Sequence, residues 1–133
     1  MYEYHGWITL RMTPGEIDNE EALLWEVHQT IKNVLSSFNH RNRISDLKIM
    51  NGQYFLWIAG SANHASSEAK DLFDLLELIS SKTPGSYGLV YILDDEAPES
   101  LSNKFQVVRI ARGQVEKFQD NLLSPCIPVI EDP

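Results

Sequence analysis

A serine and a histidine three residues apart are the first side chains in this sequence that could do chemistry. Ser61 and His64 stand in the segment Gly60-Ser61-Ala62-Asn63-His64, between an expected strand and an expected helix. A serine nucleophile needs a base and an orienting acid in register with it, and the residues around Ser61 do not form the Gly-x-Ser-x-Gly turn of serine hydrolases. We therefore favour a structural role for Ser61, Asn63 and His64, in which they shape the loop and cap the next helix.

The remaining histidines, acids and cysteine do not form a metal-ligand pattern. No two of the four histidines have the i, i+4 spacing of a helical zinc site, and the single cysteine, Cys126, excludes a cysteine-rich site. Asp94, Asp95 and Glu96 follow an expected strand, but adjacent strand residues point to opposite faces, which favours a solvated acidic turn. No glycine-rich phosphate loop occurs. We expect no metal, no cofactor and an unreactive Cys126 thiol.

Aromatic and cationic side chains are expected to share the sheet face that points away from the helices. They are Trp7, Phe55 and Trp57, with Arg11, Lys48 and one of Arg109 or Arg112. RNA-recognition domains use flat rings to stack bases and cations to neutralise phosphate. The glycine-aromatic motif of those domains is missing, however, and the net charge opposes nucleic acid. The alternative, which we favour, is that the apolar, proline-containing tail at 122–130 covers this face.

Acidic side chains dominate the expected surface. The 133 residues include 19 acidic and 11 basic residues, which gives a formal net charge of −8. Such a surface repels nucleic acid and anionic membranes, and it attracts and steers basic proteins. The candidate residues for binding a basic partner are Asp71, Asp74, Asp94, Asp95, Glu96 and Glu99. The alternative is that these acids only keep the protein soluble.

The hydrophobic patterns place these residues on a β-α-β-β-α-β-β chain. Strands are expected at 4–12, 44–50, 53–59, 87–93 and 105–112, and helices at 18–40 and from Ser66 or Ser67 to 82. Asp18 is expected to cap the first helix, and Ser66 or Ser67 the second. Asn51-Gly52 favours a two-residue hairpin turn, because both positions accept a positive φ. The fourth strand is apolar on both faces and is expected to be central, whereas 114–119 is expected to form only a short turn.

This element order predicts an α+β fold, a ferredoxin-like variant with a five-stranded antiparallel or mixed sheet and two helices on one face. The third strand can lie between the first and second, and a mixed sheet with another strand order is the alternative. One core suffices for 15.2 kDa, so we expect a single domain at 1–133, with 114–133 as a covering tail. The N-terminus lacks signal-peptide features, no apolar run spans a membrane, and cysteine is scarce, so we expect a cytoplasmic protein.

Five short segments are specific as a set, through their order and spacing. They are Tyr2-Glu3-Tyr4-His5-Gly6-Trp7, Gly60-Ser61-Ala62-Asn63-His64, Leu89–Glu96 with its Asp94-Asp95, Ala111-Arg112-Gly113, and Leu123-Ser124-Pro125-Cys126. With these segments the chain resembles, over nearly its whole length, the immunity protein 7 family of bacterial polymorphic toxin systems.

The resemblance implies a small cytoplasmic protein, encoded beside a toxin, that binds the toxin domain and blocks it without catalysis. Toxins of these systems are often nucleases, and the basic substrate sites of nucleases suit the acidic composition of this chain. In this interpretation Gly60, Asn63, His64 and Gly113 hold the fold, and the acidic surface contacts the toxin.

Two other functions remain as alternatives. The first is a single-stranded nucleic-acid-binding domain that uses the aromatic face with Trp7, Phe55 and Trp57. The second is a small enzyme that uses Ser61, His64 or Asp94, although no complete catalytic set accompanies them.

Overall fold

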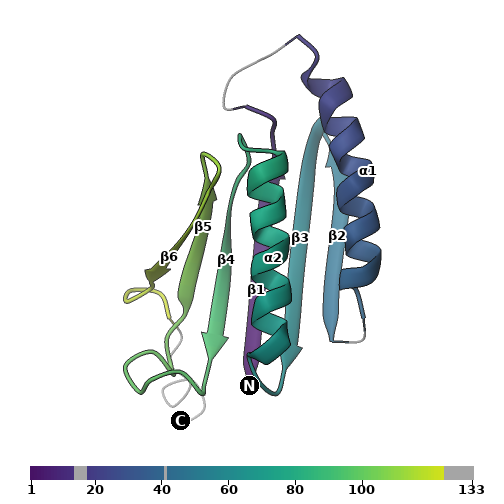
Figure 1. The fold of residues 1–133 in the computed structure, drawn as a ribbon. Coiled ribbons are helices and arrows are strands. Elements are labelled where there is room, and N and C mark those ends of the chain that lie inside the picture. Colours follow the sequence, from purple (N-terminus) through teal and green to yellow (C-terminus); the bar gives the residue numbers. More distant parts are fainter. Residues whose placement is uncertain (14–17, 41, 125–133) are drawn as a thin grey trace.

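An antiparallel sheet covered on one face by two helices makes up the part of the chain that the computed structural model describes, residues 1–13, 18–40 and 42–124. Figure 1 shows α1 and α2 side by side on that face, with β5 and β6 extending beyond them. The elements are β1 (Tyr2–Leu10), α1 (Glu20–Phe38), β2 (Arg43–Met50), β3 (Gln53–Ala62), α2 (Ser66–Lys82), β4 (Tyr87–Asp94), β5 (Gln106–Ala111) and β6 (Gln114–Gln119).

The strand order is β2-β3-β1-β4-β5-β6, and every neighbouring pair is antiparallel. β3 lies between β1 and β2, as the element order predicted for a split βαβ arrangement. β4 pairs with β1 on one side and with β5 on the other, which confirms its predicted interior position. The α+β class and the placement of both helices on one face are therefore confirmed.

The sheet has six strands, so the prediction of five is wrong. Residues 114–119, expected to form only a short turn, form β6 and pair with β5. A tight turn at Arg112-Gly113, with φ values of 53° and 72°, joins the two strands and matches the turn at Asn51-Gly52, with 52° and 73°. The pattern gave no signal for β6 because its apolar residues, Val115 and Phe118, point to opposite faces.

The start of α1 differs from the capping prediction. The helix begins at Glu20, and Asn19 rather than Asp18 occupies the N-cap position, without a side-chain hydrogen bond. The Glu20 carboxylate instead accepts a hydrogen bond of 3.1 Å from the backbone N–H of Met12. A contact with the segment after β1 therefore anchors this helix end.

The start of α2 also lacks the predicted serine cap. Ala65 occupies the N-cap position, and Ser66 is the first residue of the helix. The acidic Glu68 in the first turn supplies the negative charge that a helix N-terminus favours.

No helix among the described residues is long and apolar enough to span a membrane.

The core lies between the sheet and the helices, and each helix turns one apolar stripe toward it. Its helical members are Leu24, Ile31, Leu35 and Phe38 of α1 and Leu72, Leu75, Leu76 and Ile79 of α2. The register pairs Leu47 with Leu56 and Ile49 with Tyr54, so these four residues share the inner face of the β2–β3 hairpin. Because successive side chains of a strand point to opposite faces, the other strand residues point away from the helices, on the face that no described helix covers.

Gly60 in β3 leaves the space that the Tyr4 ring fills. A Cβ on Gly60 would lie 2.5 Å from ring atom Cζ and from the hydroxyl oxygen of Tyr4. Tyr4 is fully buried, and this burial raises the pKa of its hydroxyl well above the usual range. The hydroxyl has no hydrogen-bond partner among the described residues, so ring packing is what holds Tyr4 in place.

We predict that Gly60→Ala lowers the free energy of unfolding by about 1–3 kcal/mol, because the added methyl group overpacks the buried ring. Urea unfolding measures the change. Gly52→Ala is the control, since a Cβ there meets nothing within 4 Å and only its φ of +73° is strained. In a Tyr4→Leu background the Gly60→Ala cost should shrink, and an unchanged cost would show that the ring is not the cause.

Candidate functional site

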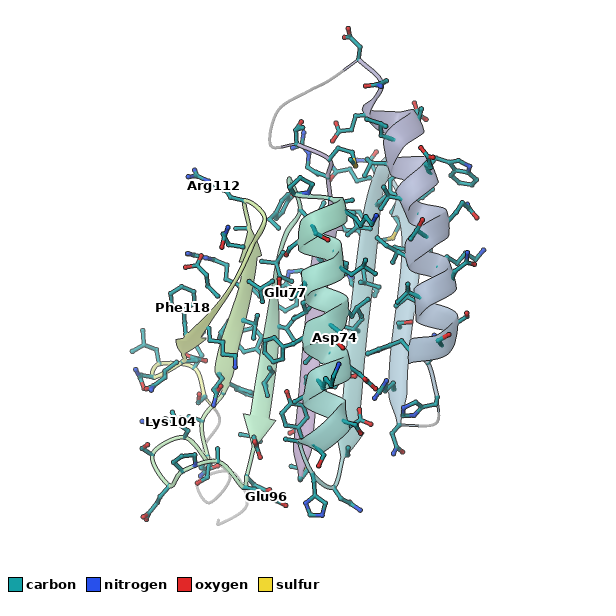
Figure 2. All side chains as sticks on the ribbon, in the orientation of Figure 1. Asp74, Glu77, Glu96, Lys104, Arg112 and Phe118 are labelled. Carbon is teal, nitrogen blue, oxygen red and sulfur yellow. The ribbon has the colours of Figure 1, made fainter. Side chains whose placement is uncertain are left out.

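The six acidic residues selected from the sequence lie in two groups. Asp94, the last residue of β4, is followed by Asp95, Glu96 and Glu99, and these four residues are here named the acidic loop; Asp71 and Asp74 lie on α2 and are here named the helix pair. In Figure 2, Asp74 points away from the sheet on the outer side of α2, and Glu96 lies at the end of the sheet where α2 begins. One acidic site thus lies on α2, and Glu96 places the other at the end of the sheet.

The acidic loop is fixed against the start of β1 and the segment before α2. The backbone N–H of Asp95 donates to the Met1 carbonyl at 3.2 Å, and that of Glu96 donates to the Asp94 carboxylate at 3.1 Å. The Asp95 carboxylate also accepts a hydrogen bond from the Met1 amine, which raises the pKa of that amine. Glu96 pairs with Nδ1 of His64. The Asp95 and Glu96 side chains remain 48% and 54% exposed, so their carboxylates are held in place and accessible.

Arg43, the first residue of β2, is a buried cation that sequence reasoning missed. Its Nε and Nη2 each donate at 2.8 Å, to Glu68 and Asp71, and its Nη1 donates to the Phe38 carbonyl at 3.2 Å. The Arg43 side chain is only 4% exposed. Burial disfavours the charged guanidinium, but the hydrogen bonds to Glu68 and Asp71 outweigh it and raise the pKa of Arg43. Asp71 is therefore a structural partner as well as a surface carboxylate.

Asp74 is the more accessible member of the helix pair. It accepts a hydrogen bond of 2.6 Å from Lys70 on the preceding turn of α2, and this bond raises the pKa of Lys70. Both side chains are largely exposed, so the pair contributes little to stability and can exchange partners at low cost.

A groove of about 410 Å³ between α1 and α2 adjoins the helix pair. It is lined by Val34, Ser37 and Phe38 of α1, by Asp71, Asp74, Leu75 and Leu78 of α2, and by Arg43. Its floor is mainly apolar and its α2 rim is acidic. Such a groove suits the aliphatic stem of a lysine or arginine whose cation lies beside Asp74.

Ser61 and His64 are not brought together as a catalytic pair. Ser61 pairs across the sheet with Glu3 in β1, whereas the His64 ring pairs with Glu96. Within residues 1–13, 18–40 and 42–124, no three histidine, cysteine, aspartate or glutamate side chains cluster in a way that could hold a metal. Cys126 lies outside the described residues.

The sheet face opposite the helices, here named the open face, carries the three predicted aromatic residues. Trp7 and Trp57 stand directly opposite each other in β1 and β3, and Phe55 lies two residues before Trp57 on the same face. Trp7 and Trp57 are 47% and 53% exposed. The part of the predicted covering tail that the structure describes does not bury them, since Leu122 and Leu123 are 93% and 77% exposed.

The charges on the open face are mixed. Lys48 stands opposite Phe55, but Asp46 stands opposite Trp57. Arg109 of β5 donates at 3.1 Å to Glu116 of β6. Among the predicted cations, Arg112 lies in the turn at the tip of the β5–β6 hairpin (Figure 2). The described residues thus supply stacking surfaces without the continuous cationic track that a nucleic-acid strand needs.

A model of the family described as Immunity protein 7 matches residues 1–132. This match includes every described helix and strand, both acidic groups and the open face. A search of curated proteins and a search of solved structures each returned no match.

We predict that Arg43→Met lowers the free energy of unfolding by about 3–5 kcal/mol, because it leaves Glu68, whose side chain is only 12% exposed, without this cation. Thermal and urea unfolding measure the loss. Lys70→Met, which removes an exposed pair, should cost less than about 1 kcal/mol. Adding Glu68→Leu to Arg43→Met should recover stability, and a further loss instead would show that the orphaned carboxylate is not the cause.

We also predict that short single-stranded oligonucleotides leave the tryptophan fluorescence unchanged at low salt, because Asp46 and Glu116 border the exposed rings. Saturable quenching that weakens as salt rises would instead establish the nucleic-acid alternative.

Proposed function

Because the chain belongs to the Immunity protein 7 family, we propose that it binds a cognate bacterial toxin domain and neutralises it by stoichiometric sequestration. The family relationship gives the general function of an immunity protein and a toxin protein as its partner. The nature of the toxin, the contact residues and the mode of inhibition are our inferences from charge and geometry.

The proposed target is a nuclease, and the main support is electrostatic. A nuclease needs a basic site to bind phosphates, and this chain carries a formal net charge of −8. An acidic protein that occupies a basic substrate site competes directly with nucleic acid. Protection would then take place in the cytoplasm, where the nucleic acid of the producing cell lies.

The observation that carries the proposed contact surface is the anchoring of the acidic loop. Asp95 and Glu96 are held by Met1 and His64, yet about half of each side chain stays exposed. Carboxylates that are already positioned lose little conformational entropy when a partner binds. Together with Asp94 and Glu99 they would replace substrate phosphates in the basic site of the toxin.

The helix pair would form the second part of the contact. Asp74 and the apolar floor between α1 and α2 suit one lysine or arginine of the toxin, with the stem against Leu75 and Leu78. Asp71 contributes charge at the same rim while it holds Arg43. Acids at two sites would steer the encounter and fix the relative orientation of the two proteins.

Titration of the purified toxin with this chain tests sequestration against catalysis. Activity should fall linearly and end at one immunity chain per toxin domain, and mass spectrometry should find the toxin unaltered after denaturing separation. Complete inactivation at a small fraction of one equivalent, or a covalent change in the toxin, would mean that the chain acts as an enzyme.

We predict that reversing Asp94, Asp95 and Glu96 to lysine lowers the association rate constant for the toxin about tenfold or more at low ionic strength, since steering charges are lost. The association rate constants of the variant and the wild type should approach each other as salt screens the charges. Stopped-flow mixing measures the rate, and urea unfolding confirms that the variant is folded.

The matched control reverses Asp18, Glu21 and Glu26, three exposed acids before and within α1, and so changes the net charge by the same amount. Asp74→Lys separately tests the helix pair without disturbing Arg43. If the control slows association as much as the acidic-loop variant, net charge alone is responsible and the proposed loop contact is wrong.

A further inference from the structure

The open face is an extended aromatic surface that the proposed toxin contact does not use. Seven aromatic side chains lie on it, namely Trp7, Phe55, Trp57, Tyr87, Tyr91, Phe105 and Phe118. Trp7 stacks on Tyr91 at 6.0 Å between ring centroids, and Phe105 meets the edge of Tyr91 at 5.6 Å. Contiguous exposed apolar surface of this kind usually marks a protein interface, and rigid rings lose little entropy when they are buried.

The sheet register arranges this face in rows that are complementary to themselves. One row reads Asp46, Trp57, Trp7, Leu89, Arg109 and Glu116 from β2 to β6. Asp46 therefore lies two strands to one side of Trp7, and Arg109 lies two strands to the other side. When a second copy of the row is rotated by half a turn about an axis along β1 and laid against the first, Trp7 faces Trp7. Each Asp46 then lies opposite an Arg109, and each Trp57 opposite a Leu89.

The neighbouring row is also complementary to itself, through the sizes of its side chains instead of their charges. It reads Ile44, Ala59, His5, Tyr91, Val107 and Phe118 in the same strand order. Turned about His5, it sets the small Ala59 opposite the large Tyr91, and Ile44 opposite Val107. Ile44 is 71% exposed, which is unusual for an isoleucine in a sheet, and such a contact would bury its side chain.

We propose that two copies of this chain pack open face against open face, about a two-fold axis that runs along β1. This axis keeps each row opposite its own reversed copy, as in an aligned two-sheet sandwich with a separation of about 10 Å. Asp46 of each copy then pairs with Arg109 of the other at both margins, and the tryptophans fill the centre.

The geometry of the sheet is compatible with a stable dimer. Six strands spaced at about 4.8 Å give a face about 24 Å wide, which is the scale of an interface that buries about 800 Å² per partner. Such interfaces usually have aromatic residues in the centre and charged pairs at the rim. The helix pair lies on the helix that covers the other face, and Asp95 and Glu96 are held by Met1 and His64 at the end of the sheet, so the proposed toxin contact does not require the open face.

Sedimentation equilibrium of the full chain from about 1 to 100 µM tests the proposal. We expect a mass of about 30 kDa, twice the 15.2 kDa of the chain. Asp46→Arg and Arg109→Asp should each raise the dimer dissociation constant about tenfold or more, through like charges at the interface. The double variant, made together with Glu116→Gln so that the aspartate introduced at position 109 does not face the Glu116 carboxylate of its own chain, should return it to within about threefold of wild type, because the pair is restored with its signs exchanged.

Tryptophan substitutions provide the matched control. Trp7→Ala should dissociate the dimer, whereas Trp25→Ala on α1, which is 53% exposed against 47% for Trp7, should not. A monomer at 100 µM would overturn the proposal. The proposal would also be wrong if the double charge exchange did not restore the dimer dissociation constant. It would be wrong as well if Trp25→Ala weakened the dimer as much as Trp7→Ala does. If the monomer shields Trp7 from acrylamide and a chain ending at Ser124 does not, the tail and not a second copy covers the face.

Discussion

The buried guanidinium of Arg43 is the interaction on which the rest of the described structure depends. It joins the end of α1, through the Phe38 carbonyl, to the first residue of β2 and to Glu68 and Asp71 of α2. Desolvation offsets much of the attraction in such a cluster, so its main effect is to specify one arrangement. That arrangement fixes α2 over the sheet, and with it the position of Asp74 and the groove between the helices.

The sheet separates two surfaces of different chemistry. The acidic loop and the helix pair offer exposed carboxylates, which act over distance and suit a basic partner. On the open face, Trp7 and Trp57 offer apolar area, which acts only on contact. In our proposals the acidic sites recognise an unlike protein and the open face packs against a like one, so the two contacts use different residues.

Features with a local signal could be predicted from the sequence, and those that rest on distant partners could not. Asn51-Gly52 and the apolar stripes gave the hairpin and the helices, and strand alternation gave the shared face of Trp7 and Trp57. Arg43 was missed because its carboxylate partners lie 25 and 28 residues away. The sequence likewise located Glu96, but not His64, 32 residues away, as the contact that fixes it.

We propose that this chain protects a cell by holding a toxin domain. The first experiment is co-expression with the toxic domain encoded beside it, with an affinity tag on one of the two proteins. We expect restored growth and recovery of both proteins in a one-to-one ratio, with rescue lost when the acidic loop is reversed in charge. Continued cell death while both proteins are folded and abundant, with no co-purification, would contradict it.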